Sequence, residues 1–273
     1  MKTILVAIDF SEGSLNALFY AKKLAKILDN DLVMVHAYTP PILDPNVPVG
    51  LAEETYTQSL SILEDKLQKE VEIACKDKIR AEFKLGFGDL ASIIDDLSVH
   101  THLNMIIVGK TSHSGLIDTI IGSTAAYLID SIEVPLLVVP EDFRADLFDK
   151  FCYASQLEYD EEKYIAEAIK FSKYSNNSLE IAHIKDSDEL DIYPDQEFLK
   201  SIAERFKDDN LHVIHKESKS FKKGIQQLVQ EEGISLLILT THKRGFLDGI
   251  LNPSKTKQIL KHTAVPILIY SFE

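Results

Sequence analysis

Short apolar runs alternate along this chain with stretches whose apolar residues recur at helical spacing. The apolar residues of the first such stretch fall on one face of a helix: Leu15, Leu18, Ala21, Leu24, Ala25 and Leu28. Alternation of apolar strands with amphipathic helices predicts a parallel sheet that is covered by helices on both faces. The expected fold class is therefore α/β.

The same pattern predicts five strands in each half of the chain, with boundary errors of about two to four residues. In the first half, strands are expected at residues 2–8, 31–37, 80–86, 104–109 and 135–139. In the second half, they are expected at residues 149–155, 178–184, 211–217, 235–240 and 265–270.

The two halves repeat the same elements in the same order. The repeated segments are residues 31–37 with 178–184, residues 104–109 with 235–240, and residues 133–140 with 264–271. This self-similarity indicates a duplication, with domains at residues 1–142 and 148–273. The connection at residues 141–147 is short and charged, so the two domains are expected to pack on each other.

Several motifs of the first half lie at expected strand ends or helix starts. They are residues 6–12, 35–37, 86–89 and 109–112, followed by 122–124 and then 134–139. Together with the order of elements, they resemble the universal stress protein family over essentially the whole chain. Nucleotide-binding members of that family carry Gly, two residues, Gly, nine residues, Gly and then Ser or Thr. Gly109, Gly122 and Ser123 match this motif, whereas Ser112 replaces its second Gly.

The resemblance implies two tandem five-stranded parallel sheets of order 3-2-1-4-5, in a Rossmann-like or adenine nucleotide alpha hydrolase-like fold. In such a sheet the order of strands reverses between the first and the fourth strand, and ligands bind beyond the carboxyl ends of these strands. Asp9 and Gly109 end these two expected strands. The positive end of the expected fourth helix, which begins near Gly122, would attract a phosphate group.

The family further implies ATP or a related adenine nucleotide as ligand, with Mg²⁺ as its companion. By resemblance, Asp9 contacts the ribose and the adenine side, and Ala37 offers its backbone to adenine. The same resemblance gives the ribose-phosphate chain to Gly109, Ser112, Gly122, Ser123 and Thr124. Each residue type also suits a structural role, because Asp or Ser caps a helix and Gly serves a turn.

The second copy departs from the motif. Asp9 aligns with Gln156, Gly109 with Thr240, Ser112 with Lys243, and the Gly122–Ser123 pair with Asn252–Pro253. This loop is not expected to hold a triphosphate. Residues 241–245 of this loop include His242, Lys243 and Arg244. This basic segment is expected either to bind another anion or to be solvated surface.

Composition excludes several classes of partner and site. The formal net charge is -14, which disfavours nucleic acid and anionic membranes as partners. The apolar runs are too short to span a bilayer, and residues 1–9 lack the features of a signal peptide, so we expect a cytoplasmic protein. Cys75 and Cys152 have no partner at metal-binding spacing, and no metal site is expected. His36 and His183 are expected to close their strands by hydrogen bonding.

No catalytic residue is assigned. Gly109–Thr111 imitates the end of a Walker A loop, but the preceding residues form a strand core rather than a phosphate cradle. Neither a dinucleotide fingerprint nor a serine nucleophile motif is present. The leading hypothesis is a regulatory stress-response protein that binds ATP in its first copy. The alternatives are a nucleotide-independent interaction scaffold and a slow ATPase, in which Asp9 would have to act.

The resemblance also bears on assembly. Single-domain members of the family commonly dimerise through their last strands, and the two copies here are expected to reproduce such a dimer within one chain. Residues 136–139 and 267–270 are apolar enough to be buried at that contact. Association into a homodimer of whole chains is left open.

Overall fold

The computed structural model describes residues 2–40, 49–110, 125, 127–129, 133–145, 148–155, 161–174, 179–186, 194–207, 211–242 and 253–272. The first half contains β1 (Thr3–Ala7), α1 (Glu12–Leu28), β2 (Asp31–Tyr38), α2 (Val49–Lys76), β3 (Ala81–Phe87), α3 (Leu90–His100), β4 (Leu103–Lys110) and β5 (Leu136–Pro140). The second half contains β6 (Phe151–Ser155), α5 (Glu162–Lys173), β7 (Leu179–Asp186), α6 (Pro194–Arg205), β8 (His212–Ser218), α7 (Phe221–Glu232), β9 (Leu236–His242), α8 (Pro253–His262) and β10 (Ile267–Phe272). Residues 125 and 127–129, between β4 and β5, are helical.

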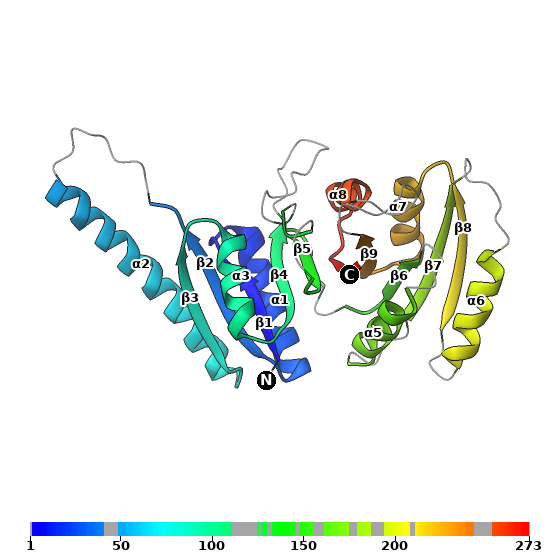
Figure 1. Ribbon diagram of the computed structural model, residues 1–273, viewed down its shortest axis with the longest axis horizontal. Helices are drawn as coiled ribbons and strands as arrows, with labels where there is room; N and C mark the ends of the chain where they lie inside the picture. The colour runs from blue at the N-terminus through cyan, green and yellow to red at the C-terminus, as the bar shows by residue number, and fades with distance from the viewer. Residues whose placement is uncertain are drawn as a thin grey trace.

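All ten strands form one sheet of order β3-β2-β1-β4-β5-β10-β9-β6-β7-β8. Each half therefore has the predicted order 3-2-1-4-5, and the strand ends lie within two residues of the expected bounds. Within each half the strands are parallel. The two halves join through β5 and β10, which pair antiparallel with Leu137 opposite Leu268. Figure 1 shows the first half on the left and the second half on the right.

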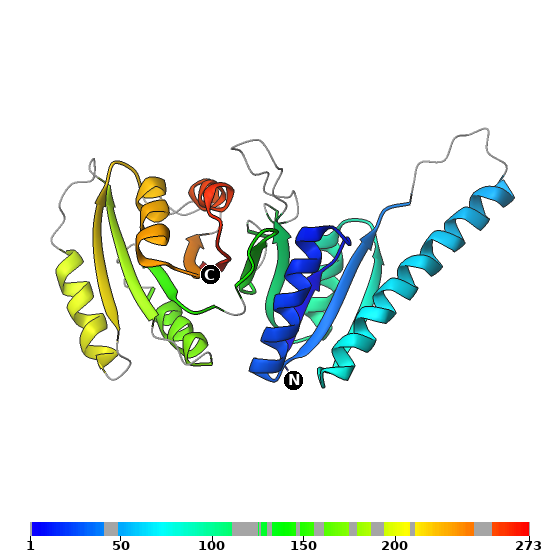
Figure 2. The same cartoon turned by 180° about the vertical axis from the view of Figure 1, so that it is seen from behind.

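Helices cover both faces of this sheet, and each face has a core that runs through both halves. One core packs α1, α2, α5 and α6 against the sheet, as seen from behind in Figure 2. The other core packs α3, α7, α8 and the helical residues near 125 against the opposite face. The join between β5 and β10 is thus buried on both sides.

Burial along the strands follows their position in the sheet. Ile4, Leu5 and Val6 of the central strand β1 are all fully buried, as expected for a parallel strand that is covered on both faces. The terminal strands β3 and β8 instead alternate exposed and partly buried residues. Their polar positions keep the two outer edges of the sheet hydrated.

The connection between the halves packs against α1. The Asn16 side-chain amide donates hydrogen bonds to the carbonyl oxygens of Pro140, at 2.8 Å, and Phe143, at 3.1 Å. The ring of Tyr20 lies 5.4 Å from that of Phe143 and 5.5 Å from that of Phe148. These contacts tie the first helix to the chain segment that leads into the second half.

Candidate functional site

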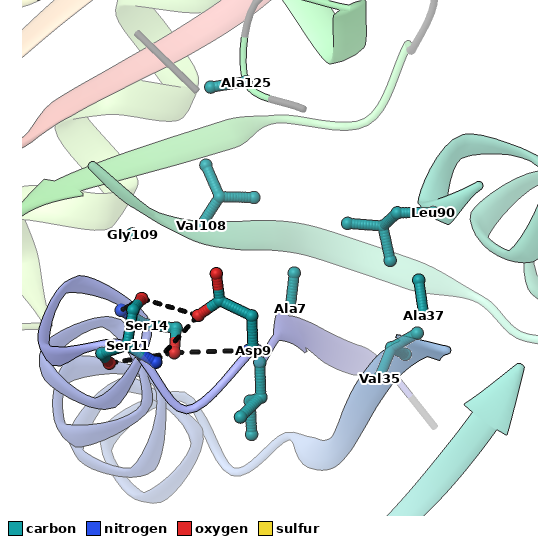
Figure 3. Close-up of a pocket in the computed structure, with 11 residues that line it drawn as sticks. Ala7, Asp9, Ser11, Ser14, Val35, Ala37, Leu90, Val108, Gly109 and Ala125 are labelled. Atoms are coloured by element: carbon teal, nitrogen blue, oxygen red, sulfur yellow. Dashed lines mark hydrogen bonds between the residues drawn. The ribbon is translucent and has the colours of Figure 1, made fainter. Parts of the chain in front are cut away.

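A pocket of about 230 Å³ opens in the first copy where the order of strands reverses. The pocket is lined by the carboxyl ends of β1, β2 and β4, by the starts of α1 and α3, and by the helical segment near residue 125. The lining residues are Ala7, Ile8, Asp9, Ser11, Ser14, Val35, Ala37, Leu90, Val108, Gly109 and Ala125. Figure 3 shows the polar residues Asp9, Ser11 and Ser14 at one end and Val35, Ala37 and Leu90 at the other. The pocket thus has a polar end and an apolar end.

Asp9 follows β1 and is held by the first turn of α1. Its Oδ1 atom accepts hydrogen bonds from the Ser11 amide at 2.9 Å and from the Ser11 hydroxyl at 2.5 Å. Partial burial raises the pKa of Asp9, but hydrogen bonds from Ser11 and Ser14 outweigh it and keep the pKa below its usual value. The carboxylate is therefore ionised at neutral pH and faces the open pocket.

The turn between Asp9 and Ser11 depends on an unusual backbone at Phe10. Phe10 has a φ of 63°, in the left-handed region, which costs about 1–2 kcal/mol for a residue with a side chain. The Phe10 ring lies 5.7 Å from the ring of His36. The Nδ1 atom of His36 lies 2.6 Å from the Ile8 carbonyl oxygen, to which it must donate because a carbonyl only accepts. His183 makes the equivalent 3.2 Å contact in the second copy, so the expected role of both histidines is confirmed.

Gly109 lines the pocket, and the structure gives a reason for this glycine that sequence reasoning did not. A Cβ atom here would lie 2.3 Å from the carbonyl carbon of Gly13 and 2.6 Å from the amide nitrogen of Ser14. The glycine therefore lets the first turn of α1 pack directly on β4. The contact of Gly109 with a ribose-phosphate chain, which the family resemblance implies, stays a prediction beside this packing role.

The apolar end of the pocket depends on the turn before α3. Gly88 has a φ of 97°, a conformation that favours glycine. Asp89 then caps α3, because its side chain accepts a 3.0 Å hydrogen bond from the Ser92 amide. Hydrogen bonds from Ser92 also lower the pKa of Asp89. This cap sets the start of the helix and places Leu90 in the pocket wall.

Three of the seven predicted site residues, Asp9, Ala37 and Gly109, converge on this pocket. Ser112, Gly122, Ser123 and Thr124 lie outside the described residues. Sequence reasoning missed Ser14 as a wall residue, although its position in the first helical turn after β1 was a usable signal. The wall residues Val35 and Val108 could not be told from other core positions of their strands.

In the second copy, the position that corresponds to Ser14 holds a buried carboxyl group. Glu161, which is fully buried at the start of α5, accepts hydrogen bonds from the hydroxyls of Ser155 at 2.6 Å, Thr240 at 3.1 Å and Tyr153 at 3.3 Å. Burial, and then the charge of Glu161, raise the pKa of Tyr153 well above its usual value, so its phenol remains a donor. The carboxyl oxygens of Glu161 thus accept from three hydroxyl groups inside the core.

Lys110, the residue after Gly109, reaches from the first copy into the second. Its ammonium donates hydrogen bonds to the carbonyl oxygens of Leu260 and Thr263, the latter at 3.0 Å. The side chain is only 4% exposed, and burial lowers the pKa of Lys110 to about 8. The strand that forms one wall of the pocket is thus bound to the end of α8.

Among the described residues, no helix has the length and apolar character to cross a membrane. Within the same ranges, His, Cys, Asp and Glu form no group of three or more that could hold a metal ion.

The chain is similar to known proteins in sequence pattern and in fold. The sequence profile of the Universal stress protein family matches residues 1–140 and 156–271. A universal stress protein from Archaeoglobus fulgidus DSM 4304 has the same fold, with 17% identity, a TM-score of 0.77 and coverage of 98% of both chains. A functionally unknown protein from Pseudomonas aeruginosa PAO1 is 15% identical with a TM-score of 0.64, over 98% of this chain and 92% of that one. No curated protein sequence matches the chain. Because the family profile covers both copies, the chain belongs to the universal stress protein family.

Proposed function

We propose that the first copy binds an adenine nucleotide, ATP or a close relative, and that binding serves regulation rather than turnover. The observation that carries the proposal is the pocket at the reversal of strand order, where Asp9, Ala37 and Gly109 meet. Open parallel sheets bind their ligands at this place.

The two ends of the pocket suit the two parts of a nucleoside. Ile8, Val35 and Leu90 offer apolar surface for a planar base, while the ionised Asp9 can accept hydrogen bonds from ribose hydroxyls. The volume of about 230 Å³ lies below the range of about 300–1,000 Å³ that is typical of sites for drug-sized ligands. The described walls therefore suit a base and a ribose, and the phosphates would lie beyond them.

The family motif assigns the ribose-phosphate chain to Gly109, Ser112, Gly122, Ser123 and Thr124, of which Gly109 lines the described pocket. Mg²⁺ would enter with a triphosphate, since this ion is usually held by phosphates, water and one or two carboxylates. Asp9 is the carboxylate of the described pocket wall. Its Oδ1 atom is already occupied by Ser11, which favours a contact through Oδ2.

In this proposal the second copy is structural. Glu161 fills the start of α5 with a buried carboxyl group at the place that corresponds to Ser14, a wall residue of the first pocket. A phosphate group brought there would meet carboxyl oxygens, which offer an anion no favourable contact, in surroundings of low polarity. The pairing of β5 with β10 would then take the place of a dimer of single-domain members.

A nucleotide-free scaffold is the rival function, and the two cores that run through both halves favour it. A rigid ten-stranded body offers partners a fixed surface whether or not a ligand is present. The two functions differ in whether the pocket of the first copy takes up ATP.

Calorimetric titration of the nucleotide-stripped full chain with ATP and Mg²⁺ tests the proposal. We expect one site per chain, and much weaker binding in Asp9→Ala. The matched control is Asp31→Ala, because Asp31 lies at the opposite, amino end of β2 and pairs with Arg80 at 2.5 Å. Absence of binding in the parent protein would leave the scaffold as the function.

A further inference from the structure

Lys110 connects two features that belong to different copies. Its neighbour Gly109 is part of the pocket wall of the first copy, and its own side chain ends at the carboxyl-terminal end of α8 in the second. The sequence separation between Lys110 and its acceptors is 150 and 153 residues. The contact is therefore made by the packing of the two copies on each other.

The contact has a clear physical basis on the side of α8. The last carbonyls of a helix lack partners within the helix, and together they form its negative end. The ammonium of Lys110 donates to the carbonyl of Leu260, in the last turn of α8, and to that of Thr263, the residue after the helix, in a place where water has little access. Loss of the Lys110 ammonium would deprive these two carbonyl oxygens of a hydrogen-bond donor in a buried place.

The backbone around Lys110 is held as firmly as its side chain. Lys110 lies opposite Pro140 in the pairing of β4 with β5, and its carbonyl accepts a 2.9 Å hydrogen bond from the amide of Glu141. On the other side, Gly109 is pressed against the Gly13 and Ser14 backbone of α1. A shift of the pocket wall at Gly109 must therefore move either α1 or the lysine.

A second connection runs from the same pocket toward the second copy. Ser11 and Ser14 line the pocket in the first turn of α1, and Asn16, in the next part of that helix, donates to the carbonyls of Pro140 and Phe143. The segment after Pro140 leads into the second copy. The pocket thus meets the second copy both through β4 and through α1.

From this arrangement we infer that Lys110 is a positioning residue that couples ligand binding in the first-copy pocket to the packing of α8 in the second copy. The inference rests on the proposed function, because it needs a ligand in that pocket. Coupling between two sites is reciprocal. The ligand should therefore stabilise the end of α8, and the contact of Lys110 with α8 should strengthen binding of the ligand.

Hydrogen exchange and calorimetry on the full chain test the coupling, with ATP and Mg²⁺ as the probe. In the parent protein, saturating ATP should slow amide exchange in peptides that cover residues 256–266. In Lys110→Met, ATP should bind about fivefold or more weakly, and at saturation it should no longer slow exchange in those peptides. A purely structural role of Lys110 would not remove this response to the ligand.

Lys22→Met is the matched control. The Lys22 side chain is 16% exposed and pairs with Glu70 at 2.6 Å, but this contact lies entirely within the first copy. The control should keep the parent affinity and the parent response of α8. Should Lys110→Met fail to fold, Lys110→Gln, which keeps an amide donor without the charge, carries the same test.

The outcomes separate the inference from the function on which it rests. Binding of ATP to the parent without any change in α8 exchange would overturn the coupling and leave the proposed function intact. An unchanged α8 response in the Lys110 variant would do the same. Absence of binding in the parent would overturn the proposed function and the coupling with it.

Discussion

The Thr240 hydroxyl donates a 3.1 Å hydrogen bond to Glu161 at the place where the first copy has Gly109 beside α1. In the first copy a Cβ atom at this strand position would overlap the helix backbone. In the second copy the same position carries a full side chain, so α5 must begin farther from its strand than α1 does. The space between them is filled by the Glu161 carboxyl group and its hydroxyl partners.

We expect Glu161→Gln to destabilise the protein by about 1–3 kcal/mol, because the amide turns one acceptor into a donor that faces buried hydroxyls. Urea unfolding, followed by circular dichroism, measures the change. Glu167→Gln on the same helix is the control, since Glu167 is half exposed and pairs with Lys170. Equal stability of both variants would mean that the buried carboxylate is not needed.

Gly109→Ala should lower the free energy of unfolding by about 1–3 kcal/mol, the usual range for an overpacked site. The new methyl group must displace the first turn of α1, because Gly13 and Ser14 leave it no room. Gly50→Ala is the control, since a Cβ atom there meets no atom within 4 Å. A loss of stability in the Gly50 variant alone would contradict the packing described for Gly109.

Ala37→Leu should weaken ATP binding about tenfold or more, a loss of about 1.4 kcal/mol in binding free energy. The longer side chain would enter the pocket from β2. Ala37→Ser, which adds a single atom, should bind ATP almost as the parent does. Calorimetric titration of both variants makes the comparison, and tight binding by the leucine variant would move the ligand out of this pocket.

Lys110 should give the stability of the protein a distinct dependence on pH. Burial lowers its folded-state pKa to about 8, below the ordinary lysine value of 10.5, so the unfolded chain binds more protons between these two values. The contribution of Lys110 to the free energy of unfolding should therefore rise as pH increases from about 8 to 10.5, by up to about 3 kcal/mol. The difference between the parent and Lys110→Met, measured by urea unfolding at several pH values, isolates this group. A constant difference across that range would show that Lys110 titrates normally.

Much of the fold could be predicted because the strands are short apolar runs that repeat in the same order. Their pattern locates all ten strands, and the family resemblance supplies their order. The family resemblance also led to the expected contact of the last strands, at residues 136–139 and 267–270, and the structure pairs β5 with β10 in one sheet.

The candidate site was only partly predictable, because its remaining features depend on how elements pack. The contact of Lys110 with α8 could not be predicted from the sequence, because the two partners are 150 residues apart. In the sequence, Glu161 is one of several acidic residues before α5. Its burial depends on the fold, which brings Thr240 and Ser155 beside it. The direction of the missing Gly109 side chain likewise depends on where α1 packs.

Because β5 and β10 pair with each other, the strand edge that could join two separate copies is already hydrogen-bonded within one chain. The sheet ends instead at β3 and β8, whose outward residues include Glu82, Lys84 and Glu217. Charged side chains on a terminal strand discourage another chain from adding to the sheet. The duplication thus fixes the stoichiometry of the two copies at one to one at any protein concentration, so that dilution cannot separate them.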